Sequence, residues 1–142
     1  MTPATFTLAN KEIMPMFESL FALDGRSQGV DGSDRPRPLV PFKFKGDLRL
    51  AIGRNIKALT PVYEELQDQK KKMRVDLLGS AEPIENERKH ENFQQLESEW
   101  RDLMAGTQDI QLYVIKWDDL RAEDNGIAPT VISSLLPIIK TD

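Results

Sequence analysis

A seven-residue repeat of apolar side chains runs through the middle of the chain, from Asp47 to Leu78. Apolar residues fill two positions of the heptad, with Lys70 as the one exception: Ile52, Leu59, Leu66 and Met73 recur at the first position, and Ile56, Tyr63 and Leu77 at the second. Such a seam is typical of a helix that packs along another helix. Asp47 is a good N-cap and Gly79 a good stop. The repeat therefore predicts one long helix, which Pro61 should kink.

A second and shorter apolar seam follows, and Gly106 closes it. Its members recur at helical spacing: Phe93, Leu96, Trp100 and Leu103. The connection over residues 80–87 is polar and contains Pro83, as a turn should. Two seamed helices joined in this way predict an antiparallel helical hairpin. We expect Leu59 and Trp100 in its core, so that an aspartate at either position would unfold the protein.

The remaining segments predict two short strands and two further helices. Residues 5–8 and 110–117 are rich in β-forming residues, and we expect them to pair because a lone strand leaves its backbone groups unsatisfied. Apolar residues at helical spacing predict a helix from a cap at Asn10 to about Asp24, and another over residues 131–139. The fold class is thus mainly α with a small β element (α+β). A long kinked helix and a second helix form an antiparallel hairpin, flanked by short N- and C-terminal strands and a final helix, in a single domain over residues 1–142.

Residues 24–41 interrupt these patterns with a stretch rich in Gly, Ser, Asp, Arg and Pro. Pro36, Pro38 and Pro41 favour an extended path. The stretch is longer than most connections within a compact domain. It predicts a flexible loop, with ordering by a partner as the alternative.

The residue inventory excludes most familiar chemistry. The absence of cysteine excludes disulfides, thiolate metal sites and a cysteine nucleophile, and one histidine, His90, cannot form a histidine-paired metal site. The acids around Asp118 fail the calcium-loop register, since Arg121 and Ile132 would stand at the first and twelfth ligand positions; they fit a capped turn or helix start. No phosphate-binding glycine motif or nucleophile elbow is present. We therefore expect no catalytic residue, no cofactor and no metal, and we predict that the chain is not an enzyme.

Charge is distributed unevenly along the chain. Residues 26–57 carry eight basic and three acidic residues, whereas residues 58–142 carry ten basic and seventeen acidic ones. The candidate partner-binding residues in the basic segment are Lys43, Lys45, Arg49, Arg54 and Lys57. Arg54 and Lys57 are three apart on the predicted helix and share a face, so we expect this patch to meet an acidic partner; the alternative is a solvated face. The run Lys70–Lys72 is offset by neighbouring acids, and the net charge of −4 argues against nucleic acid as a partner.

Four stretches of sequence stand in order along the chain: Leu8-Ala-Asn-Lys-Glu-Ile13, Leu48-Arg-Leu-Ala-Ile-Gly-Arg-Asn-Ile-Lys-Ala-Leu59, Phe93-Gln-Gln-Leu96 and Ile127-Ala-Pro129. The set resembles a family of short proteins of unknown function from tailed bacteriophages, and the second stretch is the most specific. The resemblance implies a phage origin and supplies no catalytic residue.

These observations predict a non-enzymatic bacteriophage accessory or virion-associated protein that acts through protein–protein interaction. Its expected partners are other phage or host proteins, or a second copy of the chain. Its expected location is the virion or the host cytoplasm, without a membrane, because no apolar run approaches the roughly 20 residues of a membrane span. The alternative is a phage-encoded regulator that binds and inhibits a host protein such as a defence nuclease.

Overall fold

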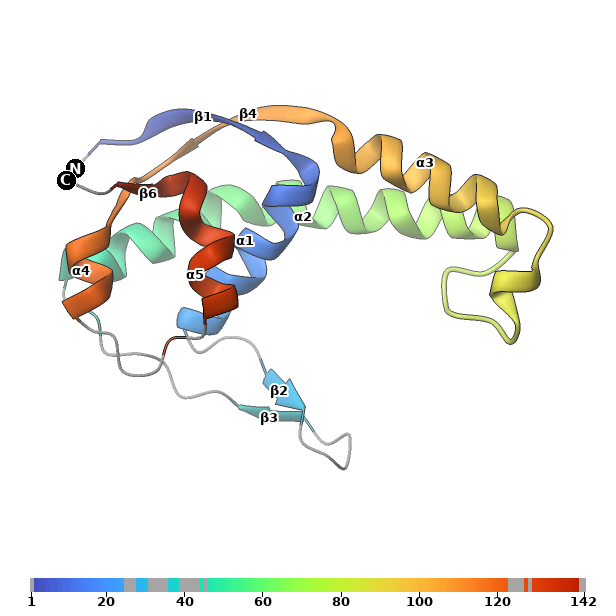
Figure 1. Cartoon of the computed structure of the whole chain (residues 1–142), viewed down its shortest axis with the longest axis horizontal. Helices are drawn as coiled ribbons and strands as arrows, with labels where there is room; N and C mark the ends of the chain where they lie inside the picture. Colours follow the sequence, from blue (N-terminus) through green and yellow to red (C-terminus); the bar gives the residue numbers. More distant parts are fainter. Residues whose placement is uncertain are drawn as a thin grey trace.

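The structure is a computed structural model, and it describes residues 2–24, 28–30, 36–38, 44, 46–122, 127 and 129–140. Its elements in chain order are β1 (Ala4–Ala9), α1 (Asn10–Leu23), β2 (Gln28–Val30), β3 (Pro36–Pro38), α2 (Gly46–Leu78), η1 (Glu87–Lys89), α3 (Phe93–Ala105), β4 (Thr107–Leu112), β5 (Ile115–Lys116), α4 (Trp117–Ala122), α5 (Pro129–Leu135), η2 (Leu136–Ile138) and β6 (Ile139–Lys140). The mainly α fold with a small β element is confirmed (Figure 1).

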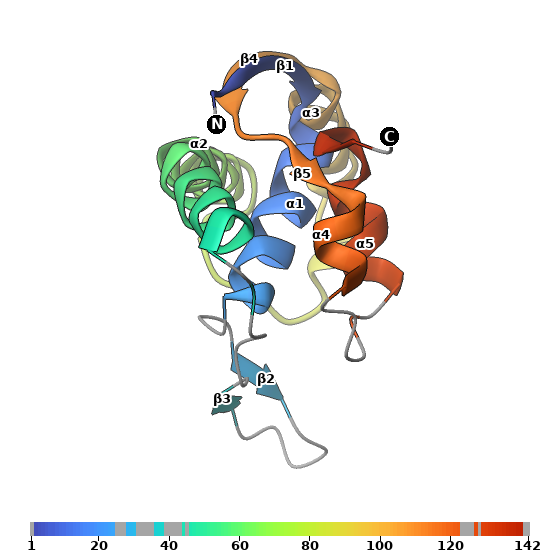
Figure 2. The ribbon, with the colours of Figure 1, turned by 90° about the vertical axis from the view of Figure 1, so that its left-hand side faces the viewer.

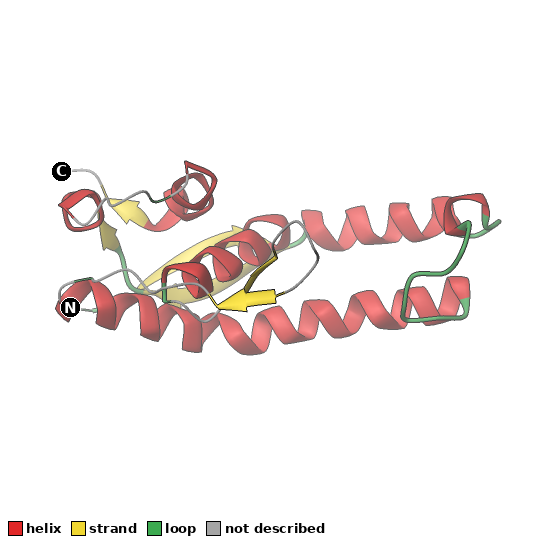
Figure 3. Cartoon of the chain, turned by 90° about the horizontal axis from the view of Figure 1, so that it is seen from below, coloured by secondary structure: helices red, strands yellow, loops and turns green. Residues whose placement is uncertain are grey.

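The expected helical hairpin is formed by α2 and α3. The two helices run antiparallel and extend together beyond the other elements as a two-helix arm (Figures 1 and 3). Helix α2 stays continuous through Pro61, and the helix axis bends along its length (Figure 1). Pro61 has no amide hydrogen, so the helical hydrogen bond to the carbonyl one turn back is missing there. The hydroxyl of Thr60 donates to the carbonyl of Ile56 at 2.7 Å, which supports the same turn.

The hydrophobic core lies at the other end of the molecule. Helix α1 sits between α2 on one side and α4 and α5 on the other, beneath the ribbon of β1 and β4 (Figure 2). The fully buried residues of the core come from α1, α2, β4, β5, α4, α5 and η2. They are Ile13, Met16, Leu20, Leu23, Ile52, Ile56, Leu59, Leu112, Ile115, Leu120, Leu135 and Ile138. In the arm, by contrast, Met73, Leu77 and Trp100 are only half-buried. The expectation that Trp100 is a core residue is therefore wrong: Leu78 and Leu96 are buried within the arm, whereas Trp100 stays partly exposed beside Lys70.

The predicted strand pair is confirmed, but the predicted C-terminal strand is too long. β1 and β4 pair antiparallel, from Ala4 opposite Leu112 to Ala9 opposite Thr107. The ladder stops at Leu112, β5 pairs in parallel with β6 instead, and Trp117 begins α4. The reason is Asn55, whose buried side chain accepts from the Tyr113 amide at 2.7 Å and donates to its carbonyl at 2.9 Å. These bonds satisfy the backbone where strand pairing ends.

The expected cap at Asn10 is also wrong. Ala9 is the N-cap of α1, and its amide donates to the Glu12 carboxylate at 3.0 Å. The buried side-chain amide of Asn10 instead donates through its nitrogen to the carbonyl of Leu103 at 2.7 Å. Its oxygen accepts from the side chain of Gln108 at 2.7 Å. It therefore ties the start of α1 to the end of α3 and to β4. Helix α2 begins at Gly46, so Asp47 lies in its first turn.

Two further boundaries differ from the sequence prediction. Within the expected loop over residues 24–41, β2 and β3 form a short antiparallel pair, while residues 25–27, 31–35 and 39–41 lie outside the described residues. The flexibility of that stretch stays a prediction. The final helix spans Pro129–Leu135 and tightens into η2, because Pro137 cannot donate a helical hydrogen bond.

Candidate functional site

The first candidate site is the outward side of the N-terminal half of α2. Its buried side faces the core through Leu48, Ile52, Asn55, Ile56 and Leu59. Helical periodicity places Arg54 and Lys57 on the opposite side and Arg49 on its flank, and all three residues are exposed. We call these three residues the basic strip. Lys43 and Lys45, predicted for the same patch, lie outside the described residues.

A shallow depression of about 450 Å³ accompanies the basic strip. Gly46, Leu50 and Gly53 line it together with the three cations. Leu50 is 45% exposed, and a side-chain carbon added at Gly53 would meet nothing within 4 Å. An incoming chain could therefore approach the helix backbone closely and place an apolar group on Leu50 between the positive charges.

One cation of the basic strip is held in place by the fold. The Arg54 guanidinium lies 5.2 Å from the centre of the Tyr113 ring, within the range of a cation–π contact. Tyr113 is itself fixed by Asn55, the residue that follows Arg54 in α2. No residue of the basic strip forms an ion pair with any residue that the structure describes. Their charges are thus presented to solvent.

The same side of α2 continues into an acidic stretch. Beyond the exposed Pro61 stand the exposed acids Glu64, Glu65 and Asp68, which we call the acidic strip. In the sequence analysis these acids served only to offset the run Lys70–Lys72. Their helical spacing from Arg54 and Lys57 was the available signal that both strips share one face.

The basic run near the end of α2 is partly used within the arm. Arg74 forms a two-pronged ion pair with Glu87, at 2.9 and 3.1 Å, and also donates to the carbonyls of Ala81 and Glu82. The hydrogen bond from Arg74 is the main reason that the pKa of Glu87 lies below its ordinary value, and the bond to Glu87 raises the pKa of Arg74. Lys70 lies 5.3 Å from the centre of the Trp100 ring. Both cations therefore stabilise the hairpin.

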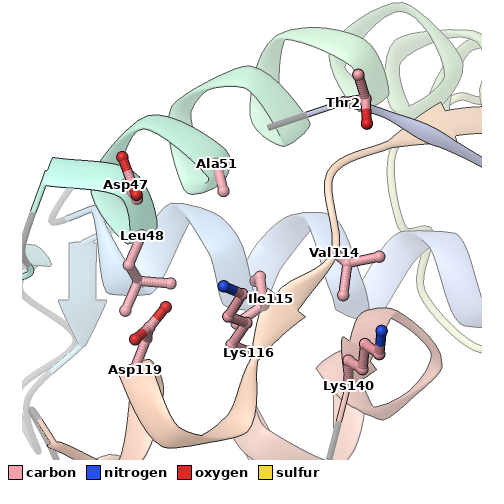
Figure 4. Close-up of a pocket in the computed structure, with 9 residues that line it drawn as sticks. All are labelled: Thr2, Asp47, Leu48, Ala51, Val114, Ile115, Lys116, Asp119 and Lys140. Atoms are coloured by element: carbon pink, nitrogen blue, oxygen red, sulfur yellow. The ribbon is translucent and has the colours of Figure 1, made fainter. Parts of the chain in front are cut away.

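The second candidate is a pocket of about 410 Å³ between the first turns of α2, the β5 strand and α4 (Figure 4). Sequence reasoning missed it because its walls come from distant segments. Its lining combines apolar and charged groups: Thr2, Asp47, Leu48, Ala51, Val114, Ile115, Lys116, Asp119 and Lys140. Two carboxylates and two ammonium groups balance in charge, and the lining contains neither histidine nor cysteine.

The remaining candidate groups have local structural roles. The ring nitrogen Nδ1 of the half-buried His90 accepts from the Asn92 amide at 3.1 Å in the hairpin connection. Asp118 and Asp119 lie in the first turn of α4, where Asp118 pairs with Arg121 at 3.5 Å, as a helix start should. The Asn125-Gly126 segment lies outside the described residues. Within the described part of the chain, no cluster of three or more acids and histidines could hold a metal ion.

Comparisons with protein-family models, with curated proteins and with solved structures find no match to this chain. The resemblance to tailed-bacteriophage proteins therefore stays a prediction. No helix among the described residues has the length and apolar character needed to cross a membrane.

Proposed function

We propose that the chain is a non-enzymatic bacteriophage accessory or virion-associated protein that acts by binding another protein through the basic strip of α2. The observation that supports this proposal is that Arg49, Arg54 and Lys57 are exposed around one depression on α2, without ion pairs among the described residues. The phage origin rests on the sequence resemblance alone.

The chemistry of the basic strip favours a partner segment that carries carboxylates about one helical turn apart. Guanidinium groups can bind carboxylates through two parallel hydrogen bonds, which orients the partner as well as attracting it. The apolar Leu50 adds a contact that excludes water beside the charges. Because exposed charges are screened by salt, we expect the association to weaken as ionic strength rises.

The experiment is capture of cross-linked partners by the tagged protein in phage-producing cells. The variant Arg49→Glu, Arg54→Glu, Lys57→Glu should keep the fold and capture at least about tenfold less partner, because it turns attraction into repulsion. The matched control reverses three exposed cations elsewhere, Lys11→Glu, Lys89→Glu, Arg101→Glu, and should capture partner normally. Equal capture by both variants would show that the basic strip is only a solvated face.

Quantitative mass spectrometry of purified particles and of the soluble lysate separates the versions of this proposal. Enrichment with particles at a fixed ratio to the capsid protein supports a virion component. Confinement to the lysate supports an assembly factor or the alternative function, inhibition of a host protein such as a defence nuclease.

A further inference from the structure

One side of α2 carries no other described element along most of the helix. Figure 2 shows α2 at one edge of the molecule, with α1 on its inner side, and Figure 3 shows the long helix as one margin of the structure. We call this side the outer face. Its exposed residues include both strips, the basic strip before Pro61 and the acidic strip after it.

The charges of the outer face are arranged symmetrically about Pro61. Lys57 and Glu65 each lie four residues from Pro61, on opposite sides, and Arg54 and Asp68 each lie seven residues from it. Spacings of four and seven residues fall on one stripe of an α-helix. All five residues are exposed. The stripe therefore carries positive charge just before Pro61 and negative charge at equal distances just after it, and exposed Lys72 follows beyond the acids.

We propose that the outer face of α2 docks antiparallel against the outer face of a second copy of the chain, with the two-fold axis at Pro61. This inference rests on the proposed function, since it names the acidic segment that the basic strip binds. In this register Arg54 faces Asp68 and Lys57 faces Glu65 of the other copy, and symmetry forms each pair twice. A parallel pair would instead place like charges together.

The exposed apolar residues of α2 fit the same arrangement. Leu50 and Val75 are 45% and 50% exposed, and both fall on the stripe that carries the charges. The antiparallel register brings Leu50 of one copy to the stretch of the other copy that contains Lys72 and Val75. Each end of the helix pair thus gains an apolar contact beyond the ion pairs, whereas the isolated chain leaves both side chains in water.

The test is sedimentation of the full chain over a concentration series at low and high salt. The wild-type protein should form dimers at low salt that dissociate as salt is added. The basic-strip variant Arg54→Glu, Lys57→Glu and the acidic-strip variant Glu65→Lys, Asp68→Lys should each be monomeric while keeping the helical circular dichroism of the wild type. An equimolar mixture of the two should form heterodimers, because each charge again meets its opposite. The control Lys11→Glu, Lys89→Glu should dimerise as the wild type does.

The outcomes separate this inference from the proposed function. A monomeric wild type, or a mixture that stays monomeric, would overturn the second-copy assignment. If in that case the basic-strip variant loses a captured partner while the acidic-strip variant keeps it, the proposed function stands and the acidic segment belongs to another protein. If neither variant loses a partner and no dimer forms, both proposals fail.

Discussion

The two halves of α2 carry the same heptad pattern and yet are stabilised in different ways. In the first half Ile52, Ile56 and Leu59 are fully buried, and this half packs against α1 and the strands β4 and β5. Toward the end of the second half, where α3 and the hairpin connection pack alongside, Met73 and Leu77 stay half-buried, although Leu66 and Leu78 are buried. Polar contacts assist there, notably the ion pair of Arg74 with Glu87. A seam therefore predicts which face of a helix is apolar, and the number of elements packed on that face decides how far it is buried.

The largest contrast should come from an aspartate placed in the core, at Leu59, and one placed in the arm, at Trp100. Leu59→Asp places an unpaired charge in the fully buried core and should lower the free energy of unfolding by roughly 5 kcal/mol, enough to unfold the whole domain. Because the side chain of Trp100 is partly exposed, the charge of Trp100→Asp can stay in contact with water. This variant should loosen the arm while the core stays folded. Hydrogen exchange monitored by mass spectrometry distinguishes global from local loss of protection. Equal global unfolding by both variants would remove the distinction between the two halves.

A smaller contrast should separate two asparagines that bind backbone groups. Asn55→Ala leaves the partly buried amide and carbonyl of Tyr113 without partners and should cost about 3 kcal/mol in chemical denaturation. Asn92→Ala in the hairpin connection removes one bond to the carbonyl of Leu77, which water can replace, and should cost about 1 kcal/mol. Similar losses of stability for the two variants would contradict the view that water reaches the backbone of the arm more easily than that of the core.

The smallest expected effect concerns pH and the hairpin connection. Since the pKa of Glu87 in the fold lies below the ordinary 4.5, its bond to Arg74 contributes fully above that pH and is lost as the pH falls through the folded value. Protection factors of residues 79–92 should therefore decrease below about pH 4.5, before those of α1. In Glu87→Gln this additional decrease should be absent. A decrease of the same size in that variant would assign the effect to other carboxylates.

Local patterns in the sequence were sufficient to predict the helices of the hairpin and the pairing of β1 with β4. They could not predict where β4 ends, because the Tyr113 backbone is bound by Asn55 from a distant segment. A trace of this contact was present, since Asn55 is a polar residue on the otherwise apolar side of α2. For the same reason Asn10 was misread as a local cap, although its partners Leu103 and Gln108 lie far along the chain.

The candidate site was predicted in part. The spacing of Arg54 and Lys57 was enough to place them on one face, and their exposure follows from the apolar seam opposite. The contact of Arg54 with Tyr113 depends on tertiary structure and had no signal in the sequence. The shared face of the two strips could have been read from the helical period, because the positions around Pro61 follow it directly.

The most direct test of the basic strip as a docking surface is site-specific photo-crosslinking in cells that produce the chain. A photoreactive residue at Lys57 should give a discrete adduct that maps to a segment carrying carboxylates, namely Glu64–Asp68 of a second copy if the dimer forms. The same group at the exposed Glu97 of α3 should give none. Absence of an adduct from position 57, or equal adducts from both positions, would contradict the account.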